Sequence, residues 1–395
     1  MVGDKIINNY YFFSTGSFPI GNASTNRAIS YMRGLVELGC DVTLFLLAPD
    51  SKQSPNSNLK NSEYKGVKIK YTCPVLFVRN KFFNKLNYIF GILIGLYHLL
   101  NVILKHKSKA PIFLLFIDPI LIWIFLAPIK MLGAKVFHER SEYPFIGKER
   151  SKMLKFYLTK VIPRFNGVYV ISNALVTYFK KFTYNPILLL PMTVELDRFN
   201  LVKNNKRGKY IAYCGSMYTD KDGIPDLIEA FNLIANEYPD IQLYLIGDNS
   251  DVEKFKIVRH KINESKVKER IICTGHIERN KMPELLCNAS MLALCRPANI
   301  QAKGGFPTKL GEYLATANPV VITDVGDHTK YLEDRKSAFI ALPDNPVDFA
   351  AKMNECLINK ELAFSVGKAG FQVALEHFNY KKQAVTLKNF VKNTL

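Results

Sequence analysis

The sequence lacks several patterns that mark large enzyme classes. It contains no Walker loop and no nucleophile elbow, the motifs of P-loop nucleotidases and α/β-hydrolases. Its seven histidines are dispersed without the spacing of metal ligands, so we expect no bound metal. The seven cysteines are odd in number, scattered and without a C-x-x-C pair, and some lie in apolar runs such as Ala293-Leu294-Cys295. This usage predicts free thiols in a reducing compartment.

The first 14 residues also lack the long apolar core and small-residue site of a secretion signal. We interpret residues 5–13 as a first β-strand instead. Together with the cysteine usage, this predicts a cytoplasmic location.

Acidic residues are scarce in the first half of the chain. The net charge of the whole protein is +19, and residues 1–200 hold 26 Lys or Arg against 11 Asp or Glu, whereas residues 201–395 hold 27 against 23. Such asymmetry indicates an anionic partner for the first half, either nucleic acid or an anionic membrane leaflet. A generally basic proteome would explain why the net charge is positive, but not why the first half carries most of it. The second half has only a small excess of basic over acidic residues, and the chain lacks interleaved aromatic and basic residues. Both observations argue against nucleic acid as the partner.

One apolar run, residues 86–104, is long enough to span a bilayer and carries Gly91 and Gly95 at GxxxG spacing. At about 100° per residue, four polar residues at or beside it fall on one narrow face. These are Asn87, His98, Asn101 and Lys105. That grouping favours a helix at an interface or against a core, with a transmembrane span as the alternative.

Strand-like and helix-like stretches alternate along the whole chain. Its 395 residues are more than a single hydrophobic core usually contains. Strands are expected at 5–13, 42–47, 67–72, 112–117, 135–138, 167–172, 210–214, 242–246, 271–274, 291–294, 320–323 and 338–340. Helices are expected at 26–38, 86–105, 121–132, 151–162, 224–237, 251–261, 283–288, 309–315, 346–359 and 380–394. The pattern predicts two doubly wound α/β domains of Rossmann type. We place them at residues 1–198 and 199–375, with a C-terminal helix in 376–395 that packs back toward the first domain.

Ligands of such sheets bind at the carboxyl ends of the strands, and residues 215–223 follow one predicted strand. Gly215 would let the backbone approach a phosphate, and the N–H groups of the following helix would attract it. Lys221 adds a positive charge. An ordinary turn between strand and helix has the same pattern and stays an alternative.

A second such segment is residues 304–314. Pro307 suits a first helical turn, and Gly304-Gly305 would loosen the loop before it. The N–H groups near Thr308 and Lys309 suit a phosphate, and Glu312 lies one turn further along the same helix. A carboxylate there can accept hydrogen bonds from a ribose diol, although an exposed helical charge would look the same.

These motifs resemble family 4 of the glycosyltransferases, the retaining group with two Rossmann-like domains facing across a cleft (GT-B). The resemblance is best over residues 214–342 and weaker over most of the chain. Gly215, Lys221 and residues 228–231 match the family, whereas Ser216 stands where it commonly has Arg. Of the family's paired glutamates, Glu312 matches the second.

The first glutamate of the pair is replaced by Gly304, and the resemblance implies that the amides of Gly304 and Gly305, or Lys303, take its place at the sugar. Residues 220–222 form a D-x-D triplet, which holds a metal in other transferases. Because this fold type is metal-independent, we expect the triplet to be solvated surface.

In the first half, residues 16–27 resemble the family's glycine-rich first loop, in which Gly21 would let the chain approach the donor. His138 ends a predicted strand where the family often places a histidine at the sugar. Glu139 follows it, and Glu142 is a weaker candidate. Residues 191–199 resemble the entry to the second domain.

The resemblance implies transfer of a sugar from a nucleotide-sugar donor, with retained anomeric configuration and a front-face substitution without a protein nucleophile. The predicted catalytic residues are His138, Glu139 and Lys309. The predicted donor-binding residues are Gly21, Gly215, Ser216, Lys221, Gly304, Gly305, Thr308, Lys309 and Glu312.

The basic first half and its apolar segments predict a saccharide or lipid-linked saccharide acceptor at the cytoplasmic face of the membrane, and hence a role in polysaccharide or capsule synthesis. No cofactor beyond the donor and no nucleic acid are expected. Two alternatives remain: a sugar-nucleotide epimerase of the same fold, and a non-catalytic protein that binds anionic surfaces.

Overall fold

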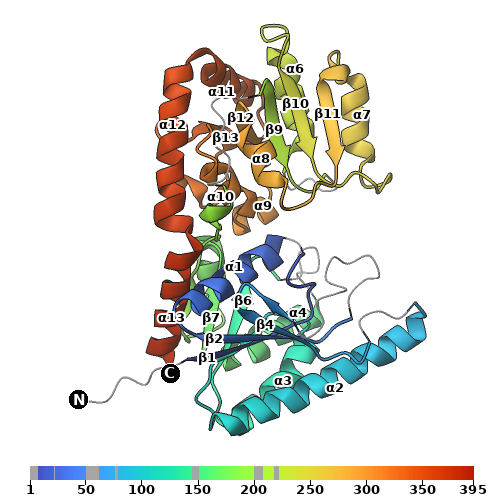
Figure 1. The fold of residues 1–395 in the computed structure, drawn as a ribbon, viewed down its shortest axis with the longest axis vertical. Coiled ribbons are helices and arrows are strands. Elements are labelled where there is room, and N and C mark those ends of the chain that lie inside the picture. The colour runs from blue at the N-terminus through green and yellow to red at the C-terminus, as the bar shows by residue number, and fades with distance from the viewer. Residues whose placement is uncertain are drawn as a thin grey trace. The chain divides into compact units, whose positions relative to one another are not determined.

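The computed structural model describes residues 8–21, 23–49, 62–75, 79–144, 151–199, 208–217 and 222–395 (Figure 1). The chain forms two compact units. Unit 1 combines Met1–Pro191 with Tyr380–Leu395, and unit 2 is Met192–Asn379. The expected domain limits, after residues 198 and 375, fall a few residues from these.

Unit 1 contains an eight-stranded sheet in the order β3-β4-β2-β1-β5-β6-β7-β8. All neighbouring strands are parallel except β3 and β4, which are antiparallel. The strands are β1 (Asn9–Ser14), β2 (Asp41–Leu46), β3 (Glu63–Tyr64), β4 (Val67–Tyr71), β5 (Ile112–Leu114), β6 (Val136–Arg140), β7 (Gly167–Val170) and β8 (Ile187–Leu189). The central strands are continuous apolar runs, as expected for a parallel sheet covered on both faces.

The helices of unit 1 are α1 (Ala23–Glu37), α2 (Lys81–Lys105), α3 (Pro119–Met131), α4 (Lys152–Phe156), α5 (Asn173–Phe179) and α13 (Tyr380–Thr394). Although α13 is last in the chain, it packs beside α1 (Figure 1). The contact is close, because a Cβ atom on Gly34 would lie 2.5 Å from the Cβ of Ala384. The buried side chains of Ala384, Leu387 and Val391 join the core of unit 1.

Unit 2 contains a six-stranded parallel sheet in the order β11-β10-β9-β12-β13-β14. Its strands are β9 (Tyr210–Cys214), β10 (Gln242–Ile246), β11 (Ile271–Gly275), β12 (Met291–Leu294), β13 (Val320–Thr323) and β14 (Phe339–Ala341). Its helices are α6 (Ile224–Ile234), α7 (Lys256–Glu264), α8 (Met282–Cys287), α9 (Ile300–Gly304), α10 (Thr308–Ala315), α11 (Pro346–Ile358) and α12 (Lys360–Val373). The segments that follow β9, β12 and β13 meet at one edge of this sheet.

Helix α2 is, within the described residues, the one helix long and apolar enough to cross a membrane by length and composition. The four polar residues expected on one face have different surroundings in the structure. Asn87 is buried, His98 stacks partly buried on Phe45, and Asn101 and Lys105 are exposed. The sheet covers only part of the helix, so residues on one line of its surface differ in exposure.

Candidate functional site

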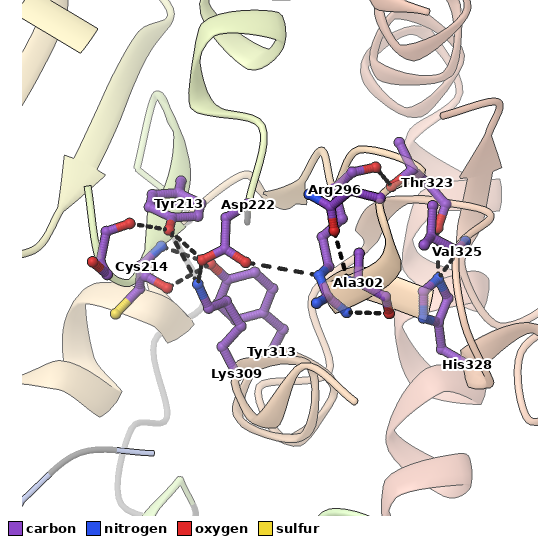
Figure 2. Close-up of polar contacts among 12 residues, drawn as sticks. Tyr213, Cys214, Asp222, Arg296, Ala302, Lys309, Tyr313, Thr323, Val325 and His328 are labelled. Atoms are coloured by element: carbon purple, nitrogen blue, oxygen red, sulfur yellow. Dashed lines mark hydrogen bonds and ion pairs between the residues drawn. The ribbon is translucent and has the colours of Figure 1, made fainter. Parts of the chain in front are cut away.

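A cluster of charged side chains in unit 2 centres on Lys309, in the first turn of α10 (Figure 2). Its Nζ atom donates to the Tyr213 hydroxyl at 3.1 Å and forms an ion pair with Asp222. Gly215 lies directly against it, since a Cβ atom there would be 2.0 Å from Nζ. The structure therefore brings Gly215 and Lys309 into contact at the end of β9, where a larger residue would displace the ammonium group from this position.

Asp222 lies between two cations, Lys309 on one side and Arg296 on the other (Figure 2). It is 5% exposed and accepts a hydrogen bond of 2.8 Å from the Tyr213 hydroxyl. Burial alone would raise the pKa of this carboxyl, but Lys309 and Arg296 reverse the effect and hold the pKa below its usual value. The expectation of solvated surface is thus wrong for Asp222, while Asp220 and Lys221 lie outside the described residues.

The position of Asp222 depends on the next residue, Gly223. Gly223 has a φ angle of +60° and precedes α6. A Cβ atom here would lie 1.8 Å from the backbone oxygen of Cys295, so glycine is required both for the angle and for the close approach.

Tyr213 is fully buried, and its hydroxyl also lies 2.9 Å from the backbone oxygen of Ser216. Burial, and then the charge of Asp222, raise the pKa of Tyr213 well above its ordinary value. The phenol therefore keeps its proton and can donate. Ser216 itself is exposed beside this cluster.

Arg296 is 1% exposed and is held by the backbone on its far side (Figure 2). Its Nη1 atom donates to the backbone oxygen of Ala302 at 3.4 Å, and its own backbone oxygen accepts from the Thr323 hydroxyl at 2.7 Å. His328 supports this loop, with Nε2 2.5 Å from the backbone oxygen of Thr323. Burial lowers the pKa of His328 to about 4, so the imidazole is neutral near pH 7.

Glu312 lies one turn after Lys309 on α10 and is paired with Arg198, Nη1 to Oε1 at 2.6 Å. Arg198 also donates to the backbone oxygen of Arg279 at 3.1 Å, which fixes the guanidinium. The Glu312 side chain is 25% exposed, and a carboxylate has further lone pairs that can accept hydrogen bonds.

The segment before α10 is more ordered than the sequence suggests. Gly304 ends the short helix α9, and the Gly305 amide donates to the backbone oxygen of Gln301 at 3.0 Å. Gly304 therefore lies in a helix and not in the expected loop, and the Gly305 amide already has an acceptor. Helix α10 begins at Thr308, and the first N–H groups of a helix have no carbonyl of their own helix to bind.

Unit 1 contains a cavity of about 270 Å³ at the carboxyl ends of β1, β5 and β6. Its lining is rich in hydroxyl and charged groups. The lining residues are Ser14, Thr15, Gly16, Phe18, Ser24, Thr25, Ala28, Leu115, Phe116, Ile117, Glu139, Arg140, Ser141 and Glu142. This composition suits a polar ligand with many hydroxyl groups.

Glu139 reaches this cavity but is already engaged. It forms an ion pair with the buried Arg27 and accepts from the Tyr31 hydroxyl at 2.6 Å. Arg27 donates in turn to the backbone oxygen of Leu190 at 2.6 Å. Gly21 lies in the exposed loop before α1, where a Cβ atom would be 2.6 Å from the backbone oxygen of Ser17.

His138 does not line the cavity. It is 0% exposed, its Nδ1 lies 2.8 Å from the backbone oxygen of Leu114, and its Nε2 lies 2.7 Å from the Tyr157 hydroxyl. Its ring also stacks on Phe165. Burial lowers the pKa of His138 to about 3, with a further contribution from Arg140. This geometry contradicts the expected contact with a sugar, because both ring nitrogens are engaged inside the core.

Sequence reasoning missed Tyr213, Arg296 and Arg198 as members of the site in unit 2. Tyr213 is the next-to-last residue of β9, and Arg296 follows β12 by two positions. Both residues lie at the carboxyl end of a strand, where ligands of such sheets bind, and this position is the signal that could have identified them. Within the described residues, no group of three or more His, Cys, Asp or Glu side chains could hold a metal ion.

A family model described as "Glycosyl transferases group 1" matches residues 208–359. No curated protein sequence matches the chain.

Solved structures resemble the chain over nearly its whole length. Sucrose-phosphate synthase from Thermosynechococcus elongatus is 15% identical with a TM-score of 0.73, and the match covers 98% of each chain. A glycosyltransferase from Rickettsia africae is 16% identical with the same TM-score and the same coverage of both chains. HepE from Anabaena, solved with UDP, is 12% identical with a TM-score of 0.72 over 98% of this chain and 100% of that chain.

These likenesses confirm the expected fold of two Rossmann-like α/β domains of the GT-B type. The family match spans β9, α6 and α10, the elements that place Gly215, Asp222 and Lys309. The part of the chain that contains the Lys309 cluster is therefore similar in sequence to the group 1 glycosyl transferases.

Proposed function

We propose that this protein transfers a sugar from a nucleotide-sugar donor, bound in unit 2, to a saccharide or lipid-linked saccharide. The contact between Lys309 and Gly215 at the end of β9 carries the proposal. Breaking the donor's glycosidic bond leaves negative charge on the departing diphosphate. A fixed cation stabilises that charge where it develops.

Lys309 fits this role through its hydrogen-bonding capacity. An ammonium group has three N–H donors, and Tyr213 and Asp222 account for two. The backbone N–H groups at the start of α10 would add donors for the same diphosphate. In this proposal Lys309, rather than a bound metal, supplies the positive charge.

Glu312 would accept hydrogen bonds from the ribose hydroxyls, with Arg198 holding its carboxylate in place. UDP is the first nucleotide to test, since the similar HepE was solved with UDP and with UDP-glucose. A hexose is accordingly the first sugar to test.

The cavity of unit 1 is the proposed acceptor site, because its hydroxyl and charged groups match a saccharide. The basic excess of residues 1–200 supports an acceptor at the anionic cytoplasmic face of a membrane. Such a reaction would serve polysaccharide synthesis.

We further propose that the reaction retains anomeric configuration by front-face substitution. A double displacement needs a protein nucleophile, which at a sugar carbon is usually a carboxylate. Glu139 is paired with Arg27 and Tyr31, and that pairing supports the front-face route.

The donor site is tested by thermal unfolding of the wild type and Lys309→Ala with UDP, GDP, ADP and their glucose conjugates. A ligand at a hundredfold excess over its dissociation constant stabilises a protein by about 2.7 kcal/mol. We expect one nucleotide series to stabilise the wild type and this effect to be lost in the variant.

Lys336→Ala is the matched control, since Lys336 is an exposed lysine of unit 2 that is also paired with a carboxylate, Glu333. It should respond like the wild type. If the folded wild type responds to no nucleotide, or if Lys309→Ala responds equally, the proposed donor site is wrong.

A further inference from the structure

Helix α2 exposes an apolar stripe along its whole length. Its exposed members recur every three or four residues, the spacing of one helix face. They are Phe82, Leu86, Ile89, Leu93, Tyr97, Leu100 and Leu104, with Phe83 and Phe90 beside them. Their exposed fractions run from 36% to 65%. A folded soluble protein rarely leaves so long an apolar surface uncovered without a partner for it.

Helix α3, next to α2, and its flanks also expose apolar side chains. The two helices pack together in unit 1 (Figure 1). The exposed apolar residues here are Ile117, Ile120, Ile124, Met131 and Leu132. We call this set and the α2 stripe together the α2–α3 face.

The opposite side of α2 is fixed to the protein. A Cβ atom on Gly91 would lie 2.6 Å from the backbone oxygen of Leu47, and the Thr72 hydroxyl donates to the backbone oxygen of Gly91 at 2.7 Å. The Asn87 side chain donates to the backbone oxygen of Val75 at 2.6 Å and accepts from its N–H at 3.1 Å. A helix that crossed a bilayer would have to carry these polar backbone partners into the hydrocarbon core.

The charged residues in the segment that forms the α2–α3 face are almost all basic. Residues 79–138 contain eight Lys or Arg and a single acidic residue, Asp118. The Asp118 carboxylate caps α3 by accepting from the N–H groups of Ile120 and Leu121. Lys81 and Lys85 lie near one end of α2 and Lys105 at the other. An apolar helix face with lysines at its ends is complementary to the apolar interior and anionic surface of a membrane.

We propose that the α2–α3 face inserts into one leaflet of an anionic phospholipid bilayer, with α2 lying parallel to the membrane plane. The inference deepens the membrane location included in the proposed function by naming the surface and its partner. The exposed aromatic rings of α2 would lie at the boundary between headgroups and acyl chains.

This orientation also bears on the acceptor. Ile117 both lines the cavity of unit 1 and belongs to the α2–α3 face. The cavity therefore adjoins the proposed membrane surface, which suits an acceptor whose apolar chain stays in the bilayer while its polar head enters the cavity.

The test is sedimentation of the full-length protein with vesicles, without nucleotide. Vesicles of phosphatidylcholine alone are compared with vesicles that contain phosphatidylglycerol. We expect binding to the anionic vesicles that weakens in 0.5 M salt, since salt screens the lysines. The double variant Phe90→Asp/Leu93→Asp should lower the partition coefficient by at least about tenfold, because two large apolar side chains no longer leave water.

The control is Ile257→Asp/Ile358→Asp, which changes two similarly exposed apolar residues of unit 2, on α7 and α11. It should bind vesicles like the wild type. The proposal is overturned if the wild type does not bind, if both double variants bind equally well, or if the α2 variant instead abolishes a dimer seen by analytical ultracentrifugation.

Thermal unfolding with UDP, measured without vesicles, keeps the two proposals separate. If UDP stabilises the protein but the protein does not bind vesicles, only the proposed membrane face is refuted. If the protein binds vesicles but no nucleotide stabilises it, only the proposed donor site is refuted.

Discussion

Asp222 controls how much positive charge Lys309 and Arg296 present to an anion. Its carboxylate contacts both cations and is buried, so its removal has two opposite consequences. Unit 2 loses the ion-pair partner of the buried Arg296 and the partly buried Lys309. A bound diphosphate, in contrast, loses a nearby negative charge.

We therefore expect Asp222→Asn to lower the free energy of unfolding by about 3 kcal/mol, the usual cost of breaking a buried ion pair. Its affinity for UDP should rise by about tenfold, because one nearby negative charge is gone. Urea unfolding and calorimetric titration measure the two effects. An unchanged stability together with weaker binding would mean that Asp222 contacts the donor directly.

The Asp222 ion pairs also predict a pH dependence. The pKa of Asp222 is lower in the folded protein than in the unfolded chain, so the folded state favours the ionised form. Its contribution to stability is present above the unfolded pKa of about 3.9 and is lost as the pH falls through the lower folded pKa. The stability difference between wild type and Asp222→Asn should accordingly shrink in urea unfolding below pH 4.

The contacts of His138 place it in the core of unit 1, so we expect its replacement to affect stability and not nucleotide binding. His138→Gln should leave UDP binding unchanged but lower stability near pH 7, since glutamine cannot fill the space beside Phe165. The unfolded chain takes up a proton at this histidine below about pH 6.5, whereas the folded protein does so only near a pKa of about 3.

The contribution of His138 to the free energy of unfolding of the wild type is therefore complete above pH 6.5. It falls by about 1.4 kcal/mol for each pH unit below that value. The stability curves of wild type and His138→Gln should converge in acid. A loss of transfer activity with unchanged stability would instead restore the sugar-contact role.

At the scale of elements, the fit of α2 against unit 1 depends on its glycines. A Cβ atom on Gly95 would lie 2.3 Å from Cδ2 of Leu47. In an isolated helix, Gly→Ala would add about 1 kcal/mol of stability. Here we expect Gly95→Ala to destabilise unit 1 by about 1–2 kcal/mol, because overpacking outweighs helix propensity.

Asn101→Ala is the control on the same helix, since Asn101 is exposed and alanine favours the helix. Thermal unfolding should show a lower midpoint for Gly95→Ala and no decrease for Asn101→Ala. A stabilised Gly95→Ala would mean that α2 packs less closely than described.

Most elements were predictable because local apolar runs determine them. The strands 210–214, 242–246, 291–294 and 320–323 were predicted with the same limits as β9, β10, β12 and β13. Helix α12 was missed, since Gly367 and Gly370 weaken its helical pattern. Both glycines are there for tertiary reasons, because a Cβ atom on Gly367 would lie 2.4 Å from the backbone oxygen of Ala317. Strand β8 was missed because three residues give too short a pattern.

The site was predictable only where a local motif marked it. Gly215 and Lys309 belong to recognisable strand-to-helix segments. Asp222 was misjudged and Arg198 overlooked, because their partners Lys309 and Glu312 are distant in sequence and pairing of this kind has no local signature. His138 matched a local pattern, but its burial depends on Tyr157 and Phe165, which the sequence alone does not bring to it.

At the scale of the whole molecule, unit 1 depends on a helix that follows unit 2 in the sequence. We expect Leu387→Ala on α13 to lower the stability of unit 1 by about 3 kcal/mol, because Leu387 is fully buried in its core. Val385→Ala is the matched control, since Val385 is 42% exposed on the same helix. Limited proteolysis should show faster cleavage in residues 8–191 for Leu387→Ala only. Equal cleavage of both variants would mean that α13 contributes little to unit 1.

The discontinuity of unit 1 also sets an order of events on the ribosome. Unit 2 is one continuous stretch, so it is complete as soon as Asn379 has emerged. Unit 1 is made first but cannot cover the α13 side of α1 until residues 380–395 are synthesised. During translation the nascent chain therefore exposes an apolar surface next to Gly34, which is the kind of surface that chaperones bind. The half of the protein that is translated first thus lacks part of its core until the last helix has been made.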